Sequence, residues 1–393
     1  MNVPLNIESI RRDTPGCENM VHLNNAGSSL PPQSVTQSMI DHLKLESQMG
    51  GYEAFDAAQE KCERTYGAIA ELIHAKPHEI AFMENATRAW SMAFYGISFN
   101  AGDRILTAHA EYASNYIAYL QVGKRTGVKI DVIPDDEYGQ VCLKSLENMM
   151  DDRVKLIAIT HVPTNGGLVN PAAEIGKIAK DAGVLYLLDA CQSVGQMPID
   201  VKSIGCHILS ATGRKYLRGP RGTGFLYVDE GILEKIEPPF LDLHSAEWDS
   251  MNTYKIRGDA KRFETWETNY AATLGLGVAV DYANNLGLEA IWGRVHGLGN
   301  YLRKKLGNIP GVTLHDKGKE KCGIATFSLA NKSAKDVQKH LRYQKINTSV
   351  SSIQYARLDM EPRGLENIVR ASVHYYNTEE ELNSLCEALG LMA

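Results

Sequence analysis

The sequence lacks the marks of a membrane protein and of a nucleic-acid-binding protein. No apolar run approaches the roughly 20 residues that a helix needs to span a bilayer. The formal net charge of −6 at pH 7 gives no basic excess for nucleic acid or an anionic membrane surface. The first 20 residues contain acidic side chains and no apolar segment of the kind found in secretory signals. We therefore expect a cytoplasmic protein that has neither a membrane nor a nucleic acid as its partner.

Cysteine is sparse and follows no pairing pattern. The seven cysteines are odd in number, scattered, and never spaced as CxxC. This arrangement argues against both a disulfide framework and a zinc site. We interpret the cysteines as reduced thiols of a cytosolic protein and predict no metal site.

Internal repeats and low-complexity segments are also absent, and the chain instead alternates short apolar runs with helical patterns. Amphipathic stretches such as 171–182 lie between most of these runs. Alternation of this kind, with strands that are almost wholly apolar, predicts an α/β fold whose mainly parallel seven-stranded sheet is covered on both faces. A ligand is expected at the carboxyl ends of the strands. The predicted strands are 79–83, 104–107, 129–133, 155–160, 184–189, 208–211 and 224–228.

The pattern changes near Leu274, where a long helix is expected, followed by an α+β region that ends in a helix from Glu379. We predict three parts: an N-terminal arm (1–25) that packs on the small domain, a large domain (26–273), and a smaller α+β C-terminal domain (274–393).

The segment 210–224 is the richest in chemistry. It places Lys215 in a glycine-rich loop directly after a predicted strand, with Thr212 and Arg214 beside it. A hydroxyl and a forked guanidinium are suited to holding a phosphate. On this segment alone, a solvated surface lysine remains the more frequent alternative.

Two further segments carry polar groups at predicted strand ends. Asp189 ends the apolar run 184–188, and a buried acid is unfavourable unless a cation meets it. A protonated ring nitrogen would be such a partner, in a charge-assisted hydrogen bond worth about 1.5–3 kcal/mol; a helix N-cap is the structural alternative. Ala86 and Thr87 open a predicted helix, so their backbone amides could face an anion. Simple capping by Asn85 or Thr87 is the alternative there.

The order and spacing of these pieces resemble the class V aminotransferase family. The resemblance runs from residues 22–27 (HLNNAG) to residues 369–378 (VRASVHYYNT). This family comprises fold-type I enzymes that depend on pyridoxal 5'-phosphate (PLP), among them cysteine desulfurases and selenocysteine lyases. The resemblance implies that Lys215 holds PLP as a Schiff base and that Asp189 faces its ring nitrogen. It also implies that Thr212 and Arg214 grip its phosphate.

The resemblance implies further cofactor contacts. Ala86 and Thr87 match the phosphate-binding turn, and Gln192 matches the residue that hydrogen-bonds the ring hydroxyl. Tyr112 stands where desulfurases carry a ring-stacking histidine; its phenol offers a stacking face but is a poorer proton shuttle near neutral pH. A core aromatic is the alternative for Tyr112.

Substrate contacts and a partner subunit are implied in the same way. Thr164 or Asn165 matches the loop that touches the ring hydroxyl and the substrate, and Arg370 matches the arginine that binds the substrate α-carboxylate. Asn25 lies in the arm that borders this arginine. Thr268 resembles the residue that reaches the partner's phosphate, so a homodimer with its active site at the interface is expected.

The chain departs from the desulfurases in one respect. A desulfurase needs a cysteine on a mobile loop ahead of the substrate arginine, but no cysteine lies between Cys322 and Cys386. Serine oxygen cannot accept sulfur as a persulfide. The variant resembles ergothioneine-pathway C–S lyases and isopenicillin-type epimerases. Arg357 and Arg363 follow this segment. They are candidates for binding a second anionic group of the substrate, with surface or structural pairing to Asp359, Glu361 or Glu366 as the alternative.

These features predict a PLP-dependent enzyme whose substrate is an amino acid, a small molecule. Our hypothesis is a C–S lyase that eliminates the β-sulfur substituent of a cysteine S-conjugate or its sulfoxide, with the Lys215 amine as the base for the Cα proton. An aminotransferase or an amino-acid epimerase is the alternative, because the residues do not decide the later steps. A non-catalytic scaffold of the same fold and a nucleotide-binding protein using the loop 219–224 are remoter alternatives; that loop lacks the GxxxxGK[ST] order.

Overall fold

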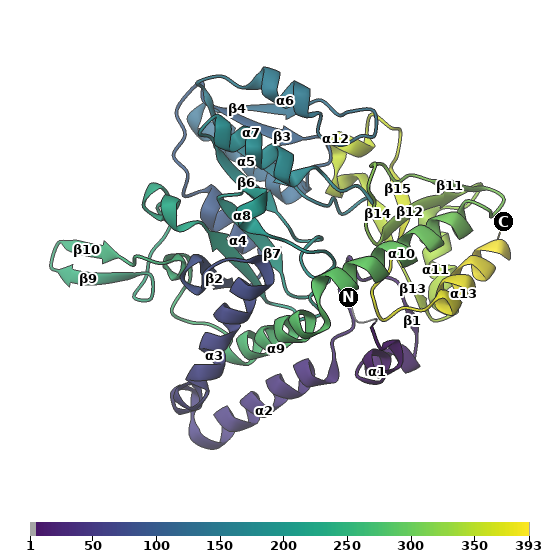
Figure 1. Cartoon of the computed structure of the whole chain (residues 1–393), viewed down its shortest axis with the longest axis horizontal. Coiled ribbons are helices and arrows are strands. Elements are labelled where there is room, and N and C mark those ends of the chain that lie inside the picture. The colour runs from purple at the N-terminus through teal and green to yellow at the C-terminus, as the bar shows by residue number, and fades with distance from the viewer. Residues whose placement is uncertain (1–4, 393) are drawn as a thin grey trace.

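The computed structural model describes residues 5–392 and is built around a seven-stranded sheet with the order β2-β8-β7-β6-β5-β3-β4 (Figure 1). β8 runs antiparallel to both of its neighbours, and the other adjacent pairs are parallel. Each predicted strand is present, and the predicted mainly parallel α/β sheet is confirmed. The strands are β2 (Ile80–Met83), β3 (Arg104–Ala108), β4 (Lys129–Ile133), β5 (Val154–Thr160), β6 (Leu185–Asp189), β7 (Ile208–Thr212) and β8 (Gly224–Val228).

Alternate residues of each central strand enter two different hydrophobic cores. In β5, Ile157 and Ile159 join one core while Leu156 and Ala158 join the other. Because successive side chains of a strand point to opposite faces, both faces of the sheet are buried. This explains why the strands read as unbroken apolar runs.

Helices cover both faces of the sheet (Figure 1). α7 packs its apolar stripe into the first core and α4 into the second. α2, α3 and α9 pack against one another beside the sheet. The helices of this part are α2 (Gln33–Met49), α3 (Gly51–Ile73), α4 (Ala86–Phe94), α5 (Ala113–Thr126), α6 (Leu143–Met149), α7 (Ala172–Asp181), α8 (Val201–Ile204) and α9 (Tyr270–Leu286).

A second, antiparallel sheet with the order β11-β12-β15-β14 forms the C-terminal part. The predicted α+β region and its last helix are present, the latter capped at Thr378. The elements are α10 (Leu288–Leu306), β11 (Val312–Leu314), β12 (Ile324–Leu329), α11 (Ala334–Tyr343), β13 (Ile346–Asn347), β14 (Ser349–Ser352), α12 (Arg357–Met360), β15 (Asn367–Ser372) and α13 (Glu379–Gly390).

The N-terminal arm lies on this smaller part, as far as residues 5–25 describe it; residues 1–4 of the predicted arm and residue 393 of the predicted small domain lie outside the described residues. α1 (Ile7–Arg12) is joined to α13 by an ion pair of 2.8 Å between Arg11 and Glu381. β1 (Val21–His22) pairs in parallel with β13.

The predicted boundary between residues 273 and 274 falls inside α9, which packs on α2 and α3. The packing neighbours change after Gly287, because α10 lies against α13 and β12. Gly287 joins the two helices with a φ of 82°, a conformation that favours glycine. The division into domains therefore stays a prediction, and the helix packing favours a boundary at Gly287.

A hairpin of β9 (Ala246–Ser250) and β10 (Thr253–Ile256) extends from the larger part (Figure 1). Short 3₁₀ helices complete the chain: η1 (Pro15–Glu18), η2 (Pro77–Glu79), η3 (Glu230–Lys235), η4 (Ala260–Phe263) and η5 (Ile353–Tyr355). Within residues 5–392, no helix has both the length and the apolar character needed to cross a membrane.

Candidate active site

A cavity of about 80 Å³ lies at the carboxyl ends of β6 and β7, where an α/β sheet is expected to hold a ligand. It brings together most of the residues predicted from the sequence. Five predicted residues do not line it: Asn25, Asn165, Thr268, Arg357 and Arg370. The lining consists of Asn85, Ala86, Thr87, Tyr112, Thr160, Val162, Thr164, Asp189, Cys191, Gln192, Thr212, Arg214 and Lys215.

Lys215 contributes an amine that has no carboxylate partner. Of the ion pairs formed among residues 5–392, none includes Lys215. Burial lowers the pKa of the Lys215 amine, so its neutral form is populated more readily than that of a surface lysine. Lys215 is partly buried and lines the cavity, so the structure does not favour the alternative of a solvated surface charge.

Asp189 ends β6 and is 5% exposed. Its Oδ1 accepts a hydrogen bond from the Cys191 backbone N–H at 3.0 Å, and its Oδ2 accepts one from Asn115 Nδ2 at 3.0 Å. The chain after Asp189 forms turns, so no helix is capped there. The N-cap alternative for Asp189 is wrong. The buried carboxylate lines the cavity, where a cationic group of a ligand can contact it.

Ala86 and Thr87 form the start of α4 and also line the cavity. The Asn85 side chain caps this helix by accepting from the Arg88 backbone N–H at 2.9 Å, which is the capping foreseen as the alternative. Capping leaves the first backbone amides of α4 directed at the cavity. Gly224 of β8 permits this placement, since a Cβ there would lie 3.1 Å from the Ala86 nitrogen and 2.6 Å from the Ala211 oxygen.

Arg214 and Thr212 contribute a guanidinium and a hydroxyl to the cavity lining. Arg214 Nη1 donates to the Gly27 carbonyl, and no carboxylate pairs with it within the described chain. Burial, with a contribution from Arg221, lowers the pKa of Arg214. The Thr212 hydroxyl donates to the Thr223 carbonyl at 3.4 Å. Arg214 therefore gives the cavity a positive charge that no carboxylate of the described residues neutralises.

Arg370 of β15 lies behind Thr164 rather than on the cavity wall. Its guanidinium donates to Thr164 Oγ1 at 2.7 Å, to Ser349 Oγ at 3.0 Å and to Asn24 Oδ1 at 3.3 Å. Arg370 is 8% exposed and forms none of the ion pairs found among residues 5–392. Burial lowers its pKa to about 10. A buried guanidinium that contacts only neutral groups is suited to an incoming anion.

Asn25 is placed differently from the prediction. It is fully buried, with Nδ2 donating to the Ser372 carbonyl at 2.7 Å and Oδ1 accepting from the Tyr376 hydroxyl. These bonds tie the arm to the smaller sheet and leave no group directed at the cavity. The neighbouring Asn24, and not Asn25, makes the contact with Arg370.

Asn165 and the two later arginines also lie elsewhere. Asn165 Nδ2 donates to the Ser352 carbonyl at 3.3 Å, which leaves Thr164 as the member of the predicted pair on the cavity wall. Arg357 is exposed and pairs with Glu361 at 3.1 Å, so its assignment to the substrate is not supported. Arg363 pairs with Asp359 at 2.8 Å. Pairing within the protein accounts for both arginines, at the surface for Arg357 and with the buried Asp359 for Arg363.

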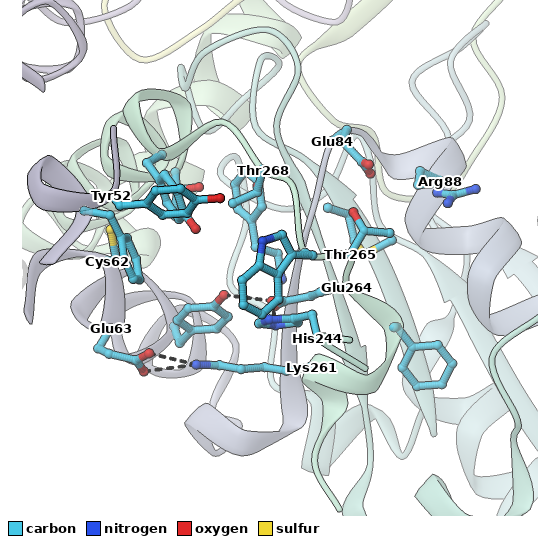
Figure 2. Close-up of a pocket in the computed structure, with 18 of the residues that line it drawn as sticks. Tyr52, Cys62, Glu63, Glu84, Arg88, His244, Lys261, Glu264, Thr265 and Thr268 are labelled. Carbon is cyan, nitrogen blue, oxygen red and sulfur yellow. Dashed lines mark hydrogen bonds and ion pairs between the residues drawn. The ribbon is translucent and has the colours of Figure 1, made fainter. Parts of the chain in front are cut away.

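Thr268 lines a separate, larger cavity of about 390 Å³ (Figure 2). Tyr52 and Glu84 line it as well, and Lys261 and Glu63 pair within it at 2.9 Å. Thr268 therefore does not line the Lys215 cavity of its own chain. The predicted contact with the phosphate of a partner chain requires such a position but is not tested by it.

Sequence reasoning assigned no role to Cys191, Asn115 and Glu111, which the structure places at the cavity wall or links to Asp189 by hydrogen bonds. Cys191 lines the cavity beside Asp189, Asn115 binds the Asp189 carboxylate, and Glu111 binds Asn115. All three stand close in sequence to residues that the sequence analysis singled out: Glu111 and Asn115 beside Tyr112, and Cys191 between Asp189 and Gln192. The only sequence signal was the spacing of Glu111 and Asn115, which are four residues apart and could therefore contact each other at the start of a helix.

The cavity has the donors and acceptors that PLP requires. Lys215 and Arg214 outweigh the single carboxylate of Asp189, which suits a phosphate-bearing group. Gln192 donates to Ala26 O at 3.1 Å and to Thr164 Oγ1 at 3.2 Å, while its buried Oε1 has no partner and can accept from a ligand hydroxyl. The residues present therefore fit the cofactor.

Comparison with solved structures supports this fold. A cysteine desulfurase from Thermococcus onnurineus NA1, solved in its apo form, superposes with a TM-score of 0.92 at 28% identity, covering 100% of this chain and 99% of that one. A cystine C–S lyase solved with cysteine persulfide gives a TM-score of 0.86 at 22% identity, covering 96% and 99%. The fold is that of the fold-type I PLP-dependent enzymes.

Sequence comparison identifies the family. The aminotransferase class-V model matches residues 21–385. The probable cysteine desulfurase of Methanothermobacter thermautotrophicus is 32% identical over 389 residues, covering 97% of each chain. That of Synechocystis sp. is 30% identical, covering 99% of this chain and 96% of that protein. The chain belongs to the class V aminotransferase family. Members of this family use PLP and act on amino acids, so the predicted family and cofactor are confirmed.

Proposed function

We propose that the protein is a PLP-dependent C–S lyase that eliminates the β-sulfur substituent of a cysteine S-conjugate or its sulfoxide. The observation that carries this proposal is a site equipped for an amino acid and PLP but without a thiol placed to receive sulfur. The products would be a thiol or sulfenic acid, pyruvate and ammonia, with one water consumed.

The cavity residues would hold the cofactor at both ends. The first amides of α4, Thr212 and Arg214 would bind its phosphate, and Lys215 would hold it covalently. Asp189 would keep the proton on its ring nitrogen. When bound, PLP supplies an electron sink for the electron pair left at the substrate Cα.

Other residues would support the ring and the substrate. Tyr112 would cover a face of the ring, and Gln192 would bind the ring hydroxyl. Arg370 would bind the substrate carboxylate, with Thr164 and Asn24 holding the guanidinium in place. The Lys215 amine would then take the Cα proton, a step to which a positioned base contributes about 10²–10⁴-fold. The lowered pKa of this amine supports that role, because only its neutral form accepts a proton.

The thiols support elimination over persulfide transfer. The cavity thiol, Cys191, has a pKa raised well above its ordinary value by burial and by the Asp189 carboxylate, so it stays protonated. A protonated thiol is a poor nucleophile. Between Cys322 and Cys386, which includes β14 beside Arg370, the chain has no cysteine. Sulfur would therefore leave with its own substituent.

Product analysis tests the reaction type. With a cysteine S-conjugate and its sulfoxide, we expect release of pyruvate and of the sulfur fragment in equal amounts. Alanine formed from free cysteine would identify a desulfurase instead. Aminated cofactor without pyruvate would identify an aminotransferase, and loss of optical activity without pyruvate an epimerase. Any of these three results in place of pyruvate contradicts the proposal.

We also propose a homodimer in which Thr268 reaches the phosphate site of the partner copy. The position of Thr268 away from its own Lys215 cavity supports this, as does the exposure of Tyr52 (69%) and Trp266 (54%), which line the Thr268 cavity.

Sedimentation tests the dimer. The parent is expected to have the mass of two chains. Trp266→Glu should dissociate it and weaken PLP binding about tenfold, because a charge would be buried in an apolar contact. Tyr343→Glu serves as the control, since Tyr343 is 91% exposed on α11, far along the chain from the Thr268 stretch. A parent that sediments as a single chain contradicts this assembly.

A further inference from the structure

Glu111 is a buried carboxyl to which the proposed reaction assigns no role. It lies between β3 and α5 and is 3% exposed. No lysine, arginine or histidine forms an ion pair with it in the part of the chain that the structure describes. A buried acid without a cation is unfavourable unless hydrogen bonds replace its water, so its partners indicate what holds it there.

Five donors surround the Glu111 carboxyl. Oε1 accepts from the Tyr112 backbone N–H at 2.7 Å, from Asn115 Nδ2 at 3.0 Å and from the Thr160 hydroxyl. Oε2 accepts from the Thr107 hydroxyl at 2.8 Å and from the Tyr119 hydroxyl at 3.2 Å. The donors come from the ends of β3 and β5 and from the first turns of α5. Glu111 therefore joins three elements that converge on the cavity.

One of these donors leads directly to Asp189. Asn115 Nδ2 lies 3.0 Å from Glu111 Oε1 and 3.0 Å from Asp189 Oδ2. An amide nitrogen carries two hydrogens, so each carboxylate receives one of them. The reverse orientation of the amide would direct its oxygen at two carboxylates. Glu111 thus allows a single orientation of Asn115.

Capping of α5 explains only part of this arrangement. A hydrogen bond from the Tyr112 N–H to the carboxyl would satisfy the start of the helix. It does not explain why Asn115 also bonds Asp189 at the end of β6. With Asn115 fixed on Oδ2 and the Cys191 N–H fixed on Oδ1, both oxygens of Asp189 are held. The plane of the Asp189 carboxylate is set by these two donors.

We propose that Glu111 is a positioning residue that fixes the Asp189 carboxylate through Asn115 and the start of the helix bearing Tyr112 through the Tyr112 amide. The inference rests on the proposed function, in which Asp189 holds the proton of the ring nitrogen and Tyr112 covers the ring. One carboxyl would then set the positions of both side chains relative to each other.

The ionisable groups around this network are consistent with that role. They are Tyr119 of α5, Cys191 after β6 and Lys215 after β7. Burial raises the pKa of Tyr119 well above its ordinary value, so its hydroxyl remains a donor to Glu111. Burial also raises the pKa of Glu111, and the Asp189 charge adds to the rise.

Removal of the link tests the proposal. In Asn115→Ala, we expect the dissociation constant of PLP to rise about tenfold, as for the loss of a hydrogen bond to a charged group. The pH midpoint of the bound cofactor's visible absorbance should rise by about one unit. Without Asn115, Asp189 would hold the proton of the ring nitrogen less firmly. When that proton is lost, its positive charge no longer lowers the pKa of the nitrogen through which Lys215 holds PLP, so the midpoint rises. Asp189→Asn should shift the midpoint in the same direction. Both readouts are independent of substrate turnover.

A double-mutant comparison tests the route from Glu111. Glu111→Ala should show the same two changes, and the pair Glu111→Ala with Asn115→Ala should be little worse than Glu111→Ala, because residues in one network are not additive. Glu111→Gln should stay within about threefold of the parent dissociation constant, since its amide oxygen still accepts from Asn115. Glu174→Gln is the control, because Glu174 is an exposed residue of α7.

The outcomes are separable. An Asn115→Ala protein with the parent's absorbance midpoint and PLP affinity overturns the proposal, and so do additive effects in the double variant. If Glu111→Ala does not fold, Asn115→Ala decides alone; if that variant does not fold, Asn115→Ser replaces it. A parent protein that binds no PLP contradicts the proposed function itself.

Discussion

Replacement of Lys215 with alanine is expected to remove lyase turnover, lowering the rate by at least about 10²–10⁴-fold, the contribution of a positioned acid–base group. The variant loses both the proposed covalent attachment of PLP and the proposed base for the Cα proton. No neighbour replaces it: the nearest cavity cation, Arg214, carries a guanidinium that stays protonated. The measurement is pyruvate formation from a cysteine S-conjugate.

Borohydride reduction gives the matching readout for attachment. In the parent, reduction should add the mass of the reduced cofactor to the chain, whereas in Lys215→Ala the cofactor should be removable by dialysis. Lys235→Ala is the control, because Lys235 is an exposed lysine outside the cavity. A Lys215→Ala protein that turns over substrate at the parent rate would refute the proposed mechanism together with the named cofactor roles.

Loss of Arg370 is expected to have the second largest effect. In Arg370→Ala, kcat/KM should fall by about 10²-fold or more, since removal of one partner of a buried charged pair costs about 2–5 kcal/mol. Most of the change should appear in KM, because the carboxylate is bound both before and during the reaction. Arg370→Lys should recover only part of it, because an ammonium cannot make the forked contact.

Arg357→Ala is the matched control for this loss. Arg357 is also an arginine of the smaller part, but it pairs with Glu361 at the surface. We expect its kcat/KM to stay within about twofold of the parent, as for surface substitutions generally. Equal losses in the two variants would mean that Arg370 has no special role in binding the substrate carboxylate.

The sheet and the cavity could be predicted from the sequence because their signals are local. Each strand of the large sheet is buried on both faces and therefore reads as an apolar run, as in β6 and β7. The strand ends then place Asp189 and Lys215 at one edge of the sheet without further information. The roles of these residues toward PLP and substrate stay predictions until the variants above are measured.

The errors arose where tertiary pairing decides which way a side chain points. Asn24 and Asn25 are adjacent, and in extended backbone neighbouring side chains point to opposite sides. A bridge between Asn24 and Ser372 sets the register, which directs Asn24 toward Arg370 and buries Asn25 against the smaller sheet. No feature of the segment 22–27 alone distinguishes the two.

Arg357 and Asn115 show the same limitation. Arg357 was predicted to bind the substrate. It precedes Glu361 by one helical turn and pairs with it instead. The bond from Asn115 to Asp189 joins residues 74 positions apart, which no local pattern records. The boundary at 273/274 stays a prediction; the sequence does not locate it sharply, because α9 and α10 form one nearly continuous helical pattern interrupted at Gly287.

Arg370 stands on the smaller sheet, whereas Lys215 follows a strand of the large one. Under the proposed roles, the anchor of the substrate and its base therefore belong to different lobes. The distance between the substrate Cα and the Lys215 amine would be set by how the two parts of the protein pack at Thr164 and Asn24, which contact Arg370. The packing around these two residues would then control the catalytic rate and the size of substrate that fits, although neither residue touches the reacting bond.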